Sequence, residues 1–291
     1  MSITLLFQLL VNGLVVGGLL SLVALGLVLI FGVMRVVNFA HGEFITLGAY
    51  ATYLLVSQTG LSPLIGVPVA FALGALVGWV VQVAVIAQVT SRPELDMLMV
   101  TYALSIIGLG LFAQGFGGDF RSYAAGPSGS VSLAGVMIGW RSLTVLLFSV
   151  AMGGATLLLV QRARIGLALR ALALNRDAAA SCGINVVSGE RVAFCLGVGI
   201  AAAAGSLISL IGTTTPTVGH EWVLDGFVVV VLGGMGSIGG ALAAALAIGL
   251  VQSFTSFALD DSWAKIITYL LLYATLLLRP HGLLGRRGAE A

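Results

Sequence analysis

The sequence places several polar side chains that could do chemistry in one short segment, residues 35–43, directly after a long apolar run. Arg35, Asn38, His41 and Glu43 all fall within these nine residues. Between apolar spans such groups need hydrogen-bonding partners, and they often mark a ligand route. We interpret Asn38, His41 and Glu43 as a positioning network. The alternatives are direct contact with a ligand, or a structural ion pair of Glu43 at the level of the lipid head groups.

A second unusual segment, residues 233–240, has five glycines and Ser237 between two apolar stretches. It lacks the Lys-Ser/Thr ending of a phosphate-binding loop, so it does not predict ATP binding. Close packing of helices, the alternative, needs fewer glycines, so we favour a broken helix whose free backbone groups line a cavity. Paired breaks in the two halves of a membrane protein indicate a transport pathway. We assign to it Asn38, His41, Glu43, Gly233, Gly234, Gly236 and Ser237.

The remaining candidate groups form no catalytic or metal-binding pattern. His41, His220 and His281 lie far apart in the sequence, and none has a second His or Cys at ligand spacing. Cys182 and Cys195 are expected to be free thiols. We therefore expect no metal, no cofactor and no enzymatic activity in this chain.

The composition predicts what kind of elements position these segments. Of 291 residues, 59% are hydrophobic and 8% are charged, whereas soluble proteins carry about 25% charged residues. This apolar content and the net charge of +2 exclude soluble, disordered, coiled-coil and nucleic-acid-binding classes. Apolar runs long enough to cross a bilayer as helices, without the alternating segments of a barrel, predict an all-α integral membrane protein with one domain over residues 1–291.

We expect a bundle of about eight to nine membrane-spanning helices, some of them interrupted. The 40 glycines favour close helix packing. The first span lacks the basic start and cleavage site of a signal peptide, so we expect it to remain in the bundle. The expected spans are residues 5–31, 39–56, 64–87, 97–113, 143–160, 192–211, 222–232, 238–259 and 263–278. Whether 222–232 crosses fully or re-enters is open.

The basic residues predict the orientation. Eight arginines lie in the loop 161–191 and in the tail: Arg162, Arg164, Arg170, Arg176, Arg191, Arg279, Arg286 and Arg287. The positive-inside rule places both segments in the cytoplasm, which puts the N-terminus outside and the C-terminus inside. The polar stretch 115–139 is then an extracytoplasmic loop or a cap that faces a partner.

The cytoplasmic loop 161–191 contains a short amphipathic helix. Asn175 is a suitable N-cap, Asp177 falls in the first turn, and Gly183 can end the helix. We expect a helix of about two turns over residues 176–182. Its small side chains suit docking into a groove of another protein, with a connector lying on the membrane as the alternative.

Three separate segments resemble one family, in the same order along the chain. Residues 177–183 look like the EAA-xxx-G cytoplasmic signature of ATP-binding cassette (ABC) importer permeases, with Asp177 in place of Glu. Residues 164–171 and 183–185 resemble the corresponding loop of the Liv-type permeases for branched-chain amino acids. Residues 24–27, 37–44 and 232–240 are similar to the same family, so the resemblance covers nearly the whole chain.

The resemblance implies a permease subunit of an ATP-driven importer that moves branched-chain amino acids across the cytoplasmic (inner) membrane by alternating access. The implied partners are a second homologous permease, ATPase subunits that bind ATP and Mg²⁺, an extracytoplasmic substrate-binding protein, and membrane lipid. Residues 175–183 would be the coupling helix that docks on the ATPase. The residues assigned to coupling are Arg170, Asn175, Asp177, Ala178, Ala179 and Gly183.

Other functions remain as alternatives. A related permease for urea or short amides shares the region 38–43, and composition does not separate the two substrates. An ion-coupled secondary transporter would need a charged relay inside the membrane, for which Glu43, Glu221 and Asp225 are the candidates, each near an expected helix end. A structural membrane protein without a pathway would leave the two broken segments unexplained.

Overall fold

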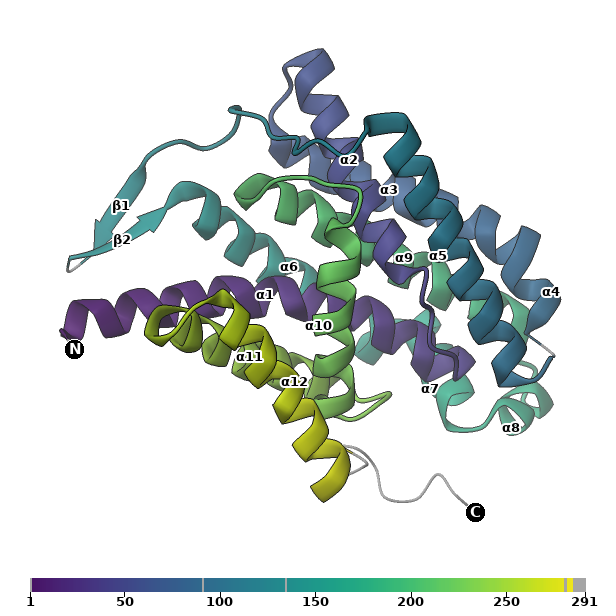
Figure 1. Ribbon diagram of the computed structural model, residues 1–291. Coiled ribbons are helices and arrows are strands. Elements are labelled where there is room, and N and C mark those ends of the chain that lie inside the picture. The colour runs from purple at the N-terminus through teal and green to yellow at the C-terminus, as the bar shows by residue number, and fades with distance from the viewer. Residues whose placement is uncertain (1, 91, 134, 280–281, 285–291) are drawn as a thin grey trace.

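The computed structural model describes residues 2–90, 92–133, 135–279 and 282–284, which are mainly helical (Figure 1). The helices are α1 (Ile3–Met34), α2 (His41–Thr59), α3 (Pro63–Val81), the π-helix η1 (Gln82–Ile86), α4 (Ala87–Val89), α5 (Glu94–Phe116), α6 (Trp140–Arg162), α7 (Arg164–Leu174), α8 (Arg176–Ser181), α9 (Val186–Ile211), α10 (Val218–Gly233), α11 (Ile238–Ala258) and α12 (Asp261–Leu278). Strands β1 (Ser130–Leu133) and β2 (Val136–Gly139) form an antiparallel hairpin.

Seven of the described helices are long and apolar enough to cross a membrane: α1, α3 with its continuation through η1 and α4, α5, α6, α9, α11 and α12. Helices α2 and α10 occupy the two remaining expected spans. Helix α10 begins at Val218, before the expected start at residue 222. The apolar pattern does not reveal this first turn because it contains polar residues. The structure confirms a polytopic helical membrane protein.

Helices α1 and α9 form the centre of the bundle. In each of them 83% of the most apolar stretch is buried inside the protein, against 28% or less in the other candidate spans. Small residues allow the neighbouring helices to approach closely. A Cβ atom on Gly48 of α2 would lie 1.8 Å from the carbonyl oxygen of Ala202 in α9, and one on Gly205 would lie 1.9 Å from that of Ile45. The glycines between α2 and α9 are therefore a packing requirement.

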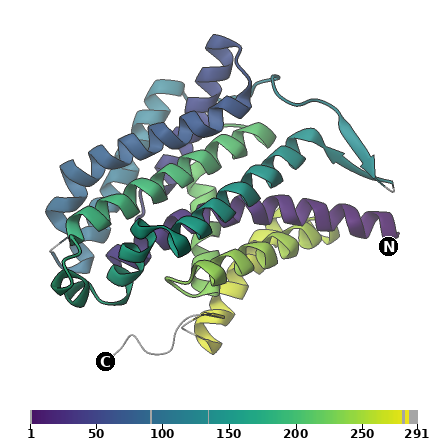
Figure 2. The same cartoon turned by 180° about the vertical axis from the view of Figure 1, so that it is seen from behind.

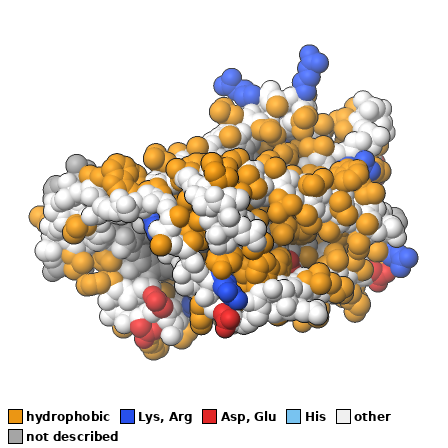
Figure 3. All heavy atoms as spheres, turned by 90° about the horizontal axis from the view of Figure 1, so that it is seen from above, with side chains coloured by type: hydrophobic (Ala, Val, Ile, Leu, Met, Phe, Trp, Pro, Cys, Tyr) orange, Lys and Arg blue, Asp and Glu red, His pale blue; other side chains and the backbone are white. Residues whose placement is uncertain are grey.

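The helices differ in direction. Figure 2 shows α3, α9, α6 and α1 running nearly parallel, whereas α10 crosses α1 steeply in Figure 1. The N-terminus and the β1–β2 hairpin lie at one end of the molecule, and α7 and α8 lie at the other. The face in Figure 3 is mostly hydrophobic with few charged side chains, as expected for a surface that contacts lipid.

The segment expected as a loop over residues 115–139 is more ordered than the sequence indicates. Helix α5 continues to Phe116, and strands Ser130–Leu133 and Val136–Gly139 form the β1–β2 hairpin, with Gly135 at φ of +84° before the second strand. Between them, the backbone of Arg121 pairs with Thr214 (2.9 and 2.7 Å). The hydroxyls of Tyr123 and Ser209 lie 2.9 Å apart. The segment is thus fastened to the end of α9 and to the connection before α10.

Candidate functional site

The N-termini of α2 and α10 meet inside the bundle. A Cβ atom on Gly219 of α10 would lie 1.8 Å from the carbonyl oxygen of Gly42 in α2. The hydroxyl of Thr46 accepts a hydrogen bond from the N–H of Gly219 (3.1 Å) and donates one to the carbonyl of Gly42 (3.2 Å). The positive dipole ends of two helices therefore converge, and they favour negative charge at this point.

The carboxylate of Glu43 lies at this junction, together with polar side chains from two other helices. Its Oε1 accepts a hydrogen bond from Ser105 of α5 (3.2 Å) and lies 3.2 Å from Nδ1 of His220 in α10. The Ser105 hydroxyl and Nε2 of His220 are 3.2 Å apart. Glu43 is 6% exposed, and its Oε2 has no partner among the described residues. This Glu43–Ser105–His220 cluster therefore keeps a free acceptor.

Asn38 and His41 do not join that cluster. The side chain of Asn38 accepts a hydrogen bond from the Ala40 N–H (3.1 Å), and its carbonyl accepts one from the His41 N–H (3.1 Å), so it forms the turn that begins α2. His41 is fully buried. A Cβ atom on Gly26 of α1 would lie 2.8 Å from the imidazole Cε1. Residues two apart on a helix do not face each other, which separates His41 from Glu43.

Sequence reasoning did not identify Ser105 and His220 as partners of Glu43. In the sequence, His220 stands out only as a histidine far from the other two. The sequence does contain a local indication of its position. Gly219, His220 and Glu221 lie in the first turn of α10, much as His41, Gly42 and Glu43 lie in the first turn of α2. Nothing in the sequence around Ser105 distinguishes it from other serine and threonine residues whose hydroxyls donate to a backbone carbonyl of their own helix.

The glycine segment separates α10 from α11. Helix α10 ends at Gly233 and α11 begins at Ile238, so the chain is broken where the sequence predicts it. Gly234 and Gly236 have φ of +101° and +84°, which side chains disfavour. The hydroxyl of Ser237 caps α11 by accepting the Gly240 N–H (3.1 Å). A Cβ atom on Gly233 would lie 2.5 Å from the carbonyl of Gly240, so the break is also a close-packing point.

The two broken segments predicted from the sequence lie side by side. A small cleft is lined on one side by Val36, Val37 and Asn38, and on the other by Val230 and Met235. Leu27, Phe31 and Phe227 complete its lining. The end of α1, the start of α2 and the end of α10 therefore share one location.

An ion pair between a buried carboxylate and an exposed lysine connects α10 to α12. Lys265, the single lysine of the sequence, pairs with Asp225. Gln252 of α11 donates hydrogen bonds to Asp225 (3.3 Å) and to Thr268 (3.2 Å). Asp225 is 2% exposed and lies within α10, so the expectation that it lies near a helix end is wrong. Because Lys265 neutralises it, Asp225 is poorly suited to act as a free charged relay.

The loop over residues 161–191 forms the short helix that the sequence predicts. Helix α8 spans Arg176–Ser181, and the side chain of its N-cap Asn175 accepts the Ala178 N–H (2.9 Å). Gly183 ends it with φ of +84°. Asp177 and Ala178 are exposed. The N-cap, the acidic first turn and the terminal glycine thus fulfil the expected local roles.

Other residues hold this helix in place. Ala179 is 4% exposed and faces the protein, so it supports α8 from inside and does not offer a contact surface. Arg176 pairs with the buried Glu190 of α9. Arg170 in α7 donates to the carbonyl of Gln161 at the end of α6 (3.3 Å). Helix α8 is therefore connected directly to α9 through Arg176 and Glu190, and α7, which precedes it, is connected to the end of α6 through Arg170.

Comparisons with known proteins agree on one family. A family model described as "Branched-chain amino acid transport system / permease component" matches residues 9–276. The high-affinity branched-chain amino acid transport system permease protein BraD of Pseudomonas aeruginosa is 30% identical, with 97% of each chain covered. LivH of Escherichia coli K12 is 28% identical over 96% of this chain and 95% of its own.

A more distant relative and a solved structure extend the comparison. A probable branched-chain amino acid transport permease protein, LivH of Methanocaldococcus jannaschii, is 27% identical over 94% of this chain and 91% of its own. The solved structure of PsaBC from Streptococcus pneumoniae in complex with Fab matches with a TM-score of 0.50 and 13% identity. It covers 93% of this chain and 91% of that one. The latter likeness concerns the fold alone.

Proposed function

The chain belongs to the family of permease components of branched-chain amino acid transport systems, and we propose that it forms half of the membrane pathway of an ABC importer for aliphatic amino acids. The observation that carries this proposal is the family match over residues 9–276, which includes both broken segments and the cytoplasmic helix. The other half of the pathway would be a second, homologous permease subunit.

The pathway passes the junction of α2 and α10. An amino acid carries an ammonium and a carboxylate, and both must be accommodated where water is scarce. The unpaired, buried oxygen of Glu43 and the half-exposed imidazole of His220 would supply an acceptor and a donor at one point once the helices part during alternating access, and the surrounding helices are apolar. Such a site suits a zwitterion with an aliphatic side chain. Asn38, His41, Gly233, Gly234, Gly236 and Ser237 act here by shaping the two broken segments.

Helix α8 couples this pathway to ATP hydrolysis. Its exposed face, with Asp177 and Ala178, would dock on an ATPase subunit that binds ATP and Mg²⁺. Asn175 and Gly183 fix its two ends, and Arg176 connects it to α9 through Glu190. Closure of the ATPase subunits would then move α8 as a rigid body, and its contacts would pass the movement to the bundle.

The orientation follows from charge. The ends of α6 and α12 and the helices α7 and α8 carry Arg162, Arg164, Arg170, Arg176 and Arg279. The positive-inside rule places this end in the cytoplasm. The N-terminus and the β1–β2 hairpin would then face the outside of the inner membrane, where a substrate-binding protein delivers its cargo.

A substrate panel tests the proposal. The chain is co-purified with its partner permease and ATPase subunits and reconstituted in vesicles with ATP, and uptake of labelled leucine, isoleucine and valine is compared with uptake of urea and acetamide. We expect uptake of the three amino acids, with each competing against the others. Uptake of urea or acetamide without competition by leucine would instead assign the chain to amide transport.

A further inference from the structure

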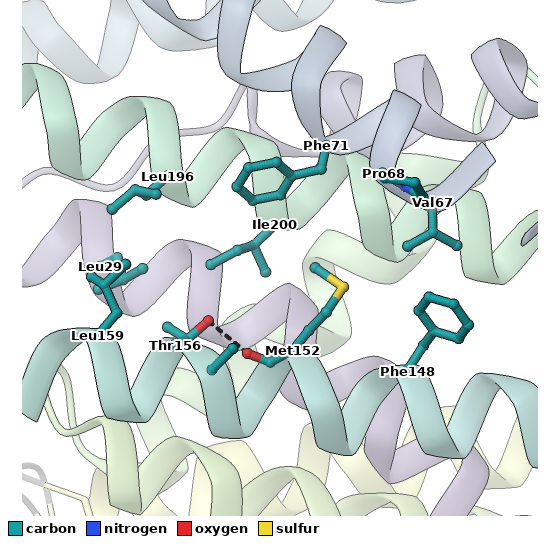
Figure 4. A pocket seen from close by; sticks show the side chains of 11 residues that line it. Leu29, Val67, Pro68, Phe71, Phe148, Met152, Thr156, Leu159, Leu196 and Ile200 are labelled. Carbon is teal, nitrogen blue, oxygen red and sulfur yellow. Dashed lines mark hydrogen bonds between the residues drawn. The ribbon is translucent and has the colours of Figure 1, made fainter. Parts of the chain in front are cut away.

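An apolar groove lies between α3 and α6 (Figure 4). Its volume is about 390 Å³. Helix α3 packs mainly on α9, and α6 packs on α1 and α9, so α3 and α6 form two walls above a floor of α1 and α9. Leu29 and Ile200 in the floor and Val67 of α3 are buried, whereas the other lining residues are half-buried or exposed. The groove is therefore open along one side.

The lining of the groove offers no polar group to a ligand. The walls carry Pro68 and Phe71 from α3 and Phe148, Met152, Ala155 and Leu159 from α6, and Leu196 of α9 adds to the floor. The single hydroxyl, from Thr156, is already used, because it donates to the carbonyl of Met152 (2.8 Å; Figure 4). An apolar groove of this kind favours an apolar ligand over water.

The two ends of the groove differ in charge. Phe148 and Val67 lie at one end in Figure 4, and Leu29 and Leu159 lie at the other. One turn beyond Leu159, α6 ends at Arg162. A Cβ atom on Gly166 would lie 2.2 Å from the Leu159 carbonyl, which places the start of α7, with Arg164, against the same turn.

These two arginines are available to a ligand. Both are exposed, and neither has an ion-pair partner among the described residues. At the opposite end of α6, the guanidinium of Arg141 is occupied, since it donates to the carbonyls of Ala124 (3.0 Å) and Leu210 (3.5 Å). Free positive charge therefore lies at the cytoplasmic end of the groove.

We propose that this groove binds one acyl chain of an anionic phospholipid from the cytoplasmic leaflet, with the head group held by Arg162 and Arg164. Basic side chains beside a groove between membrane helices are a recognised arrangement for anionic head groups. The lipid would fill the space between α3 and α6 and support the end of α6 from which α7 and α8 extend. This inference stands independently of the transported substrate.

Retention of defined lipids tests the proposal. The full chain, purified in mild detergent, is exposed to equal amounts of phosphatidylglycerol and phosphatidylcholine with identical acyl chains, and bound lipid is counted by native mass spectrometry. We expect the wild-type chain to prefer phosphatidylglycerol. Ala155→Phe, which fills the groove, is expected to lower retention at least tenfold. Equal retention of both lipids by the wild-type chain would overturn the proposal.

Matched variants separate the groove from the general surface. Ala151→Phe makes the same change one turn earlier on α6, at an exposed residue outside the groove lining, and should leave retention unchanged. Arg162→Gln should lower the preference for phosphatidylglycerol about fivefold, and Arg279→Gln at the end of α12 should not. Equal retention by the two Ala→Phe variants would refute the site.

Two further outcomes are decisive. If Ala155→Phe keeps its lipid but loses a partner subunit during purification, the groove is a protein interface and the proposal is wrong. If that variant does not fold, the wild-type chain is labelled with a phosphatidylglycerol that carries a photoreactive group in its acyl chain. Labelling concentrated in residues 148–159 supports the site, and labelling spread evenly over α5 and α12 contradicts it.

Discussion

Gly219→Ala tests whether the contact between α2 and α10 positions the Glu43–Ser105–His220 cluster. The new Cβ would lie 1.8 Å from the Gly42 carbonyl oxygen and 2.5 Å from the Thr46 hydroxyl. Because the nearer atom belongs to the backbone, the two helices must separate by roughly 1.5 Å to restore an ordinary contact. A shift of that size breaks the 3.1 Å hydrogen bond between Gly219 and Thr46. It also moves His220 away from Glu43, whose Oε1 lies 3.2 Å from the His220 Nδ1 in the unsubstituted protein.

The energetic cost can be estimated from its parts. Overpacking a core costs about 1–3 kcal/mol, and the lost hydrogen bond adds about 1 kcal/mol. The higher helix propensity of alanine returns up to about 1 kcal/mol. We therefore expect the free energy of unfolding to fall by about 1–4 kcal/mol and leucine uptake to fall at least tenfold.

The assay needs a control glycine at which the Cβ of alanine would contact no other residue. A Cβ atom on Gly154 of α6 has nothing within 4 Å, so Gly154→Ala should leave stability unchanged or slightly higher, with normal uptake. Thermal unfolding of both variants in detergent and uptake in vesicles give the comparison. Equal stability and equal uptake of the two variants would refute the proposed role of the α2–α10 contact.

Three further changes test other parts of the account. Glu43→Gln should leave subunit assembly intact and lower leucine uptake at least tenfold. The control Glu94→Gln, at the exposed start of α5, should change neither assembly nor uptake. Normal uptake by Glu43→Gln would show that Glu43 is not part of the pathway. Lys265→Met leaves the buried Asp225 unpaired and should lower the free energy of unfolding by up to about 3 kcal/mol. Adding Asp225→Asn should restore part of that loss in the same thermal assay, and no recovery would show that the pair itself contributes little. Ala178→Arg should prevent co-purification of the ATPase while the chain keeps its melting temperature. Ala179→Arg, at a buried position, should lower the melting temperature. Identical effects of the two substitutions would contradict the proposed docking face.

The parts of the structure that depend on local chemistry could be predicted from the sequence. Helix α8 begins and ends where Asn175 and Gly183 indicate, because capping needs only neighbours along the chain. The break between Gly233 and Ile238 follows in the same way from Gly234 and Gly236, which take positive φ. Most spans were found because their apolar runs are long and uninterrupted.

The parts that depend on contacts between distant residues could not be predicted. Asn38, His41 and Glu43 were grouped by their closeness in sequence, and the helix places His41 against α1 and Glu43 against α5 and α10. Ser105 and His220 reach Glu43 through tertiary packing. The pairing of Lys265 with Asp225 has the same origin, since 40 residues separate them along the chain.

The most direct test of the central claim is energy coupling in vesicles. The complex of this chain with its partner permease, ATPase and substrate-binding protein is reconstituted, and labelled leucine is followed with and without ATP. The account predicts accumulation that requires ATP and the complete complex, and that is lost with Glu43→Gln. Accumulation by this chain alone, driven by a proton gradient without ATP, would contradict it.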